Sequence, residues 1–165
     1  MLWLGGGMLY LWTISLIFYR YTFFTMSPSD LTPPYWINMG AVAISTLAGS
    51  LLALSAPLSP LLRELLPFIK GLTLMFWATA TWWIPMLVIL GFWRHVYRRF
   101  PLKYDPLYWG AVFPLGMYTV ATFRLAQAIE APILMTIPRV FVYVALTAWA
   151  LTMTGLAREL FRART

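Results

Sequence analysis

Long apolar stretches alternate with short polar connections along this chain. Five stretches are close to the roughly 20 residues that a helix needs to cross the hydrocarbon core of a bilayer. They cover residues 1–19, 36–56, 71–93, 107–126 and 140–157, and Arg124 is the only charged residue within them. Their apolar positions do not alternate as in barrel strands, and backbone groups in hydrocarbon must bond within their own segment. The pattern predicts an all-α integral membrane protein with about five transmembrane helices in a single transmembrane domain, residues 1–165.

Proline and polar residues mark the connections. Residues 25–34 read as an exposed loop, because they combine Pro, Ser and Asp. Residues 57–67 predict a short amphipathic helix at the membrane surface, with Arg63 and Glu64 toward water. Residues 94–106 form the most basic connection.

A weak internal repeat relates the second and fourth apolar stretches. Tyr35-Trp36 opens one and Tyr108-Trp109 opens the other, and a Thr follows ten residues after each Trp, at Thr46 and Thr119. A second, more uniformly apolar helix completes each unit. Repeats of this kind build many transporters, although Tyr-Trp near a membrane interface is also common by chance.

Composition excludes several protein classes. Only 10% of the residues are charged, against about 25% in soluble domains, so the chain cannot coat a soluble globule. The absence of cysteine excludes a disulfide scaffold. His95 is the only histidine, so no histidine metal cluster is possible, and no catalytic motif is present. We therefore expect neither an enzyme nor a metal or cofactor.

The basic residues are distributed unequally between the two sides that five spans would define. One side receives Arg20, Arg94, Arg98, Arg99, Lys103, Arg158, Arg162 and Arg164. The other receives Arg63, Lys70, Arg124 and Arg139. Because positive residues stay cytoplasmic, we expect a multi-pass protein of the cell (inner) membrane with a cytoplasmic C-terminus. We then expect the net charge of +7 to interact with anionic lipid headgroups rather than with nucleic acid.

The stretch at 107–126 carries the most specific chemistry. Pro114 removes the helical partner of the Gly110 carbonyl, which predicts a kink there. Phe113 stands directly before the kink, and Gly116 adds flexibility or close packing. A bulky ring at a bend could close a narrow pore by dewetting it. Ordinary packing of Pro, Gly and Phe is the alternative.

At these positions the chain resembles the second half of the tellurite-resistance/C4-dicarboxylate transporter family, which includes the plant slow anion channels (SLAC-like proteins), fungal malate carriers and sulfite exporters. The resemblance rests on PPYWINMGAVAISTLAG (33–49), ATATWWIPMLVILGFWRH (78–95) and YDPLYWGAVFPLGMYTVATFRLA (104–126). It implies a ten-helix protein of five hairpins around a central pore, of which this chain would supply five helices. It also implies a trimer, and a gating role for Phe113 within WGAVFP.

The resemblance further implies that two of the helices line the pore. The residues expected there are Asn38, Gly40, Ala43 and Thr46 on the first, and Phe113, Gly116 and Val120 on the second. Arg124 would lie at the pore mouth, or simply reach for the interface. No acidic residue lies within the five spans, which favours an anion over a cation or proton.

Three functions remain open at this point. The first is an anion channel or carrier for small inorganic anions, sulfite or C4-dicarboxylates. The second is a proton-coupled dicarboxylate or malate transporter. The third is a non-transporting membrane subunit or a truncated half of a transporter. Because two helices cannot enclose a five-hairpin pore, we expect a missing N-terminal half, a second subunit or further copies of the chain as partner, besides the lipid bilayer.

Overall fold

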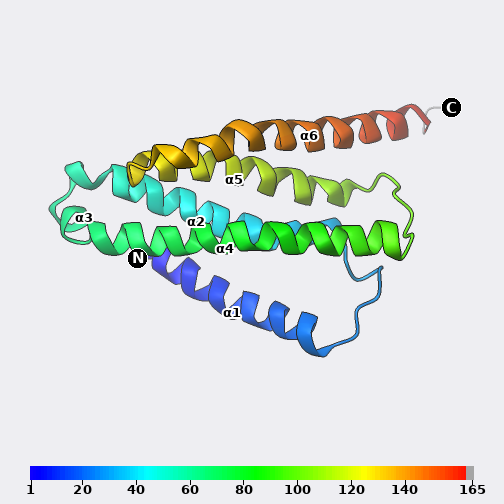
Figure 1. Ribbon diagram of the computed structural model, residues 1–165, viewed down its shortest axis with the longest axis horizontal. Helices are drawn as coiled ribbons and strands as arrows, with labels where there is room; N and C mark the ends of the chain where they lie inside the picture. Colours follow the sequence, from blue (N-terminus) through cyan, green and yellow to red (C-terminus); the bar gives the residue numbers. More distant parts are fainter. Residues whose placement is uncertain (163–165) are drawn as a thin grey trace.

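The computed structural model describes residues 1–162, and over that range it contains helices and no strand. The five long helices are α1 (Leu2–Phe23), α2 (Ile37–Leu54), α4 (Leu66–Phe92), α5 (Trp109–Ala128) and α6 (Thr136–Arg162). The predicted short helix in the second connection is α3 (Pro60–Glu64), with Arg63 and Glu64 exposed. Successive long helices run in opposite directions (Figure 1). The all-α fold is confirmed.

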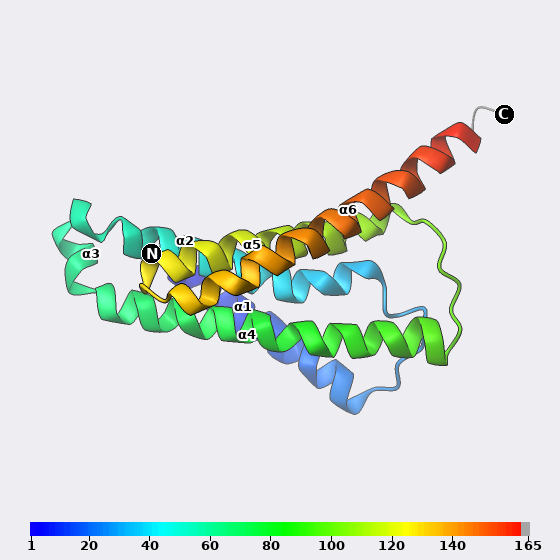
Figure 2. The ribbon, with the colours of Figure 1, turned by 45° about the horizontal axis from the view of Figure 1, so that its top comes forward.

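Each expected range holds one long helix, but the ends differ. Helix α4 already begins at Leu66, so Lys70 lies within it, and α6 continues to Arg162, beyond the expected end at Ala157. A helix can extend past the hydrocarbon core because its backbone bonds remain internal and its long basic side chains reach the interface. The far end of α6 accordingly projects beyond the other helices (Figure 2).

Four helical segments are long and apolar enough to cross a membrane among the described residues. These are Leu2–Phe23, Pro33–Leu54, Leu66–Tyr97 and Pro132–Arg162. Helix α5, the fifth span expected from the sequence, does not meet this criterion. It packs against α2 on one side and α6 on the other, so part of its surface faces protein rather than lipid.

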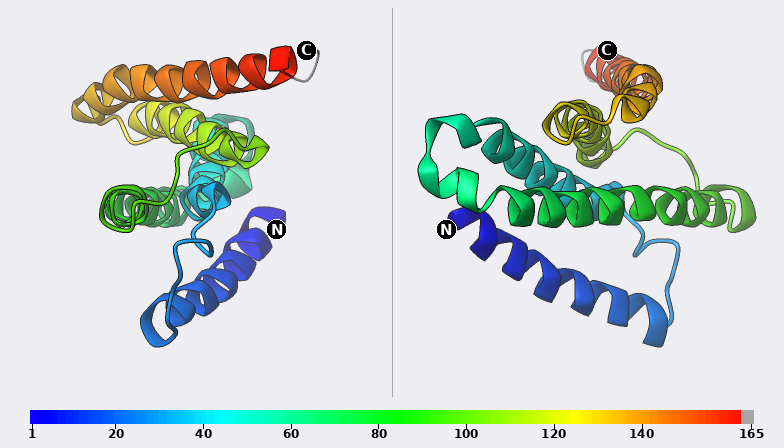
Figure 3. Two further views of the ribbon diagram at one scale, coloured as in Figure 1. Left: turned by 90° about the vertical axis from the view of Figure 1, so that its right-hand side faces the viewer. Right: turned by 60° about the vertical axis from the view of Figure 1, so that its left-hand side comes forward.

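The helices form an open row rather than a closed bundle. Helices α2 and α5 pack against each other at its centre, with α4 beside α2 and α6 beside α5. Helix α1 leans on α2 at its start and diverges from the other helices toward its end (Figures 1 and 3). It buries only Gly7. The row leaves one face of the central helices without a protein neighbour among residues 1–162.

Side chains from α2, α4 and α5 fill the core. The main cluster contains Met39, Val42, Ala43, Phe76, Ala80, Trp83, Leu87, Leu115, Tyr118 and Ala121. Hydrogen bonds between polar tips add to this packing, which suits a membrane interior where water cannot serve as partner. The Trp83 indole donates to the Tyr10 hydroxyl at 3.1 Å, and the Trp77 indole donates to the Thr122 hydroxyl at 3.0 Å. These bonds tie α4 to α1 and to α5.

The two ends of the row differ in charge. The end where α4 and α6 finish, which we call the basic end, carries Arg20, Arg94, Arg98, Arg99, Lys103, Arg158 and Arg162. The opposite end carries Arg63, Lys70, Arg124 and Arg139. Arg164, which the sequence assigns to the basic end, lies outside the described residues. The side of the membrane on which the basic end lies stays a prediction.

Both units of the proposed repeat have the same order of elements. A short 3-10 turn, Pro33–Trp36, leads into α2, and a second one, Pro106–Tyr108, leads into α5. Each is followed by a central helix and then by an outer helix, α4 or α6. In both turns proline supplies the fixed φ suited to the first residues of a helix.

Candidate functional site

Helix α5 presents a continuous open stripe. Phe113 is 56% exposed and Val120 47% exposed, and a Cβ built at Gly116 would meet nothing within 4 Å. Their spacing of three and four residues places all three on one side of the helix. We call Phe113, Gly116 and Val120 the open stripe.

The opposite side of α5 is anchored against α2. Pro114 is fully buried, and a Cβ built at Gly40 would lie only 2.8 Å from its Cγ. This close approach fixes the rotation of α5, and Phe113 therefore points away from α2 and into the open. The helix continues through Pro114 from Trp109 to Ala128, and the kink expected there stays a prediction.

The α2 residues expected to line a pore do not lie on an open side of this chain, and their role in a pore stays a prediction. Gly40, Ala43 and Thr46 are all buried, and the Thr46 hydroxyl donates to the Val42 carbonyl of its own helix at 2.8 Å. None of them faces open space in this chain. They are buried because they are small, and small residues let α2 approach its neighbours closely.

The side of α2 that does remain exposed carries larger apolar residues, namely Ile37, Ile44 and Leu51. Asn38 is half-buried, and its amide donates to the Tyr21 hydroxyl of α1 at 3.3 Å. In the sequence, nothing distinguishes these branched and long side chains from the other apolar residues of α2. Only the rotation set by the Gly40–Pro114 contact reveals them.

Arg124 lies one turn beyond Val120, near the end of α5 that is opposite the basic end. It is exposed, and its guanidinium donates to the Gln127 side chain at 3.1 Å. This hydrogen bond joins two polar side chains at one end of the open stripe. The arrangement fits a charged group at the mouth of a pathway as well as one that reaches for the interface.

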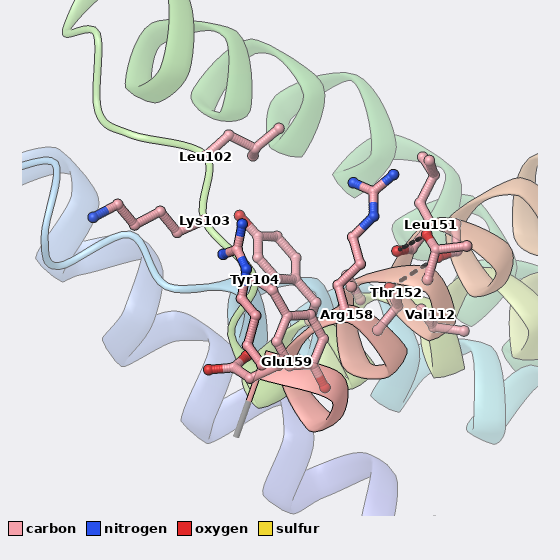
Figure 4. Close-up of a pocket in the computed structure, with 14 residues that line it drawn as sticks. Leu102, Lys103, Tyr104, Val112, Leu151, Thr152, Arg158 and Glu159 are labelled. Carbon is pink, nitrogen blue, oxygen red and sulfur yellow. Dashed lines mark hydrogen bonds between the residues drawn. The ribbon is translucent and has the colours of Figure 1, made fainter. Parts of the chain in front are cut away.

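A large cavity of about 1070 Å³ occupies the basic end. It lies between the connection at 102–108, the start of α5 and the last turns of α6 (Figure 4). Lys103 and Arg158 line it together with Glu159, and the Tyr104 ring packs on Gly155. The sequence predicted positive charge at this end but not a cavity. Its lining offers mostly positive charge to solutes.

The sequence of the chain matches a described family. Residues 1–157 match the model of the family described as voltage-dependent anion channel (SLAC1). The chain belongs to this family. The resemblance stated from its motifs is thereby confirmed, and it places the chain among membrane transport proteins.

Curated relatives of this chain occur in two organisms. An uncharacterized membrane protein of Mycobacterium tuberculosis is 40% identical over 92% of this chain and 77% of its own length. Two uncharacterized transporters of Methanocaldococcus jannaschii are 27% and 23% identical. The matches cover 73% and 96% of this chain, but only 33% and 44% of those transporters. No solved structure matches the chain.

For a family member, the chemistry of the described residues is sparse. Residues 1–162 contain no group of three or more histidine and acidic side chains that could hold a metal ion. The distinguishing features are therefore the open stripe of α5 and the two differently charged ends.

Proposed function

We propose that this chain forms part of the wall of an anion-conducting pore, with the open stripe of α5 facing the pathway and Phe113 as its gate. The exposure of Phe113 carries this proposal. The ring is 56% exposed, while its neighbour Pro114 is fully buried. The exposed fraction therefore differs strongly between two adjacent residues. The contact of Pro114 with Gly40 on one side of α5 directs the Phe113 ring away from the other helices.

The surroundings of Phe113 suit a gate. Gly116 lies one turn away and leaves space into which the ring can turn. A phenyl ring across a narrow passage closes it by excluding water, and a small rotation would reopen it. Neither α2 nor α5 contains an acidic residue, and basic residues lie at both ends, so the potential along the stripe favours anions.

The open row cannot enclose a passage by itself. The stripe has no protein neighbour among residues 1–162, so further helices must cover it. Copies of this chain, with a trimer favoured by the family resemblance, a second subunit or additional sequence would supply them. The exposed side of α2, with Ile37, Ile44 and Leu51, offers these helices an apolar surface.

The test measures anion flux into proteoliposomes for the chain, Phe113→Ala and a matched control, Phe92→Ala. Phe92 is 63% exposed near the end of the outer helix α4, so its removal controls for the loss of an exposed ring. We expect flux to rise in Phe113→Ala and to stay unchanged in Phe92→Ala. Measurable flux that is equal in all three proteins would contradict the gate.

The same liposomes distinguish the other functions. Chloride, sulfite and malate are offered separately, with and without a proton gradient. Malate entry that stops when the gradient is collapsed would identify a proton-coupled carrier instead of a channel. The absence of flux from folded, inserted protein would identify a subunit that needs further helices before it conducts.

A further inference from the structure

Arg94 occupies an unusual position for a charged residue. It lies in the π-helical turn Trp93–Tyr97 that ends α4, and it is only 9% exposed. The chain reverses directly after this turn through Arg99, whose φ of 52° is rare for a residue with a side chain. The reversal brings Phe100 back, so that its ring lies 4.3 Å from the Arg94 guanidinium carbon. Turns of this kind often accompany functional sites.

Two hydrogen bonds hold this reversal in place. The Phe100 amide donates to the Arg94 carbonyl, and the His95 ring donates from Nδ1 to the Phe100 carbonyl, each at 3.1 Å. Phe100 therefore covers one face of the guanidinium, and its position is fixed from two sides. The side chain of Arg94 is therefore held against the protein, with little of its surface exposed.

The guanidinium nevertheless lacks a partner for its hydrogen bonds. Its Nε is buried and unpaired, and within residues 1–162 no carboxylate lies within ion-pair distance of Arg94. Asp105 of the adjoining connection instead accepts from the Leu107 amide at 2.8 Å. Arginine keeps its charge in proteins, and a buried unpaired charge is costly. The side chain therefore has unused capacity to bind an anion.

A cavity of about 320 Å³ adjoins this side chain. Its volume corresponds to roughly ten water molecules, which is enough for a tetrahedral oxyanion and part of a larger group. Thr32, Tyr35, His95 and Tyr108 line it beside Arg94, and Leu87 and Val88 are among its apolar residues.

The electrostatics of the cavity favour an anion. The 3-10 turns that lead into α2 and α5 both border it, so the positive ends of two helices lie nearby.

We propose that Arg94 and this cavity form a binding site for a phosphate-type oxyanion, either inorganic phosphate or the phosphate of an anionic lipid headgroup. The planar guanidinium fork matches two oxygens of such a group. The apolar lining and the position at the basic end of the row accommodate a headgroup with its attached chain.

The site is distinct from the open stripe. Ala111 lines the cavity, while Phe113 lies two residues further along α5, about 200° around a helix of 3.6 residues per turn. Binding at Arg94 therefore does not require a conducting pore, and it is measured without flux.

The test uses the full chain in phosphatidylcholine nanodiscs, titrated with inorganic phosphate at constant ionic strength by calorimetry. Arg94→Gln removes the charge, and Arg98→Gln is the control, because Arg98 is exposed and stacked on Trp93. We expect saturable binding that weakens at least tenfold in Arg94→Gln and less than twofold in Arg98→Gln. A second arm adds phosphatidylglycerol and counts the lipid retained by the protein with native mass spectrometry.

The two arms separate the sources of the phosphate group. Binding in the first arm identifies free phosphate, and Arg94-dependent retention in the second arm alone identifies the headgroup. Absence of binding in both arms, or equal losses in Arg94→Gln and Arg98→Gln, would overturn the proposal.

A second variant fills the cavity and keeps the charge. Gly91 lines the cavity, and a Cβ built there meets nothing within 4 Å, so the side chain of Gly91→Leu starts in open space at the edge of the site. This variant answers the question even if Arg94→Gln does not fold. We expect it to bind phosphate or headgroup at least tenfold more weakly. Unchanged binding by folded Gly91→Leu would overturn the proposal.

Discussion

The contact between Gly40 and Pro114 predicts that a single methyl group at residue 40 will loosen the two central helices. An alanine Cβ there would lie 2.8 Å from the Pro114 Cγ and 3.1 Å from its Cβ, whereas carbon atoms prefer about 3.5–4.0 Å. The proline ring cannot turn away, so α2 and α5 must move apart. Overpacking of this kind costs about 1–3 kcal/mol.

Gly116→Ala provides the matched control on the other side of the same helix. Both variants gain about 0.5–1 kcal/mol because alanine is a better helix former than glycine. At residue 116 no atom lies within 4 Å of the new methyl group, so this gain is not opposed. The helix-forming term cancels between the variants, and their difference in unfolding free energy is the overpacking cost.

Thermal unfolding in detergent, followed by tryptophan fluorescence, measures this difference. A change of 1 kcal/mol shifts Tm by about 2–4 °C for a chain of this size. We therefore expect Gly40→Ala to unfold roughly 2–12 °C below Gly116→Ala, from the same cost range. Equal Tm values for the two variants would refute the close approach of α2 and α5.

Three further predictions test the packing, the surface and the orientation. Tyr118→Phe removes a buried 2.8 Å hydrogen bond with the Thr81 hydroxyl, and Tm should fall by the equivalent of about 1 kcal/mol. Asp30→Asn breaks an exposed 3.8 Å ion pair with Arg20, and stability should change by less than about 1 kcal/mol, so a larger drop would show that the pair is structural. Leu58→Cys introduces the single cysteine of the chain at a position that is 86% exposed. An impermeant maleimide should label it in intact cells. Labelling only after permeabilisation would show that the protein has the opposite orientation.

The helices could be predicted from the sequence because their cause is local. A backbone in hydrocarbon has to bond within its own segment, so an apolar run of sufficient length becomes a helix whatever surrounds it. The ends were less predictable. Hydrophobicity stops at the edge of the hydrocarbon, whereas α4 begins before its expected span, at Leu66, and α6 continues past its own, to Arg162.

The candidate site was predictable only in part, because a helical period does not say which side faces a neighbour. Phe113, Gly116 and Val120 share one side of α5 by spacing alone, and that side is open. On α2 the same reasoning selected Gly40, and the structure buries it. Its burial depends on Pro114, which is distant in the sequence, and no local pattern around Gly40 predicts this contact.

Arg94 illustrates the same limit for charge. In the sequence it is one of several basic residues in a connection, and such residues are usually solvated. The π-helical turn and the reversal at Arg99 turn it inward, beneath the Phe100 ring. Its chemistry follows from this backbone path and not from its residue type.

The polar and protein-facing residues of α5 also explain why this helix is not apolar enough to be identified as a span by its composition alone. Its buried side carries Pro114 and Tyr118, which serve contacts with α2 and α4, and its last turns carry Arg124 and Gln127. A helix that faces only lipid could not carry these groups without cost. A helix that faces protein on one side and a hydrated passage on the other can. The moderate hydrophobicity of α5 therefore agrees with the position beside a pore that we propose for it.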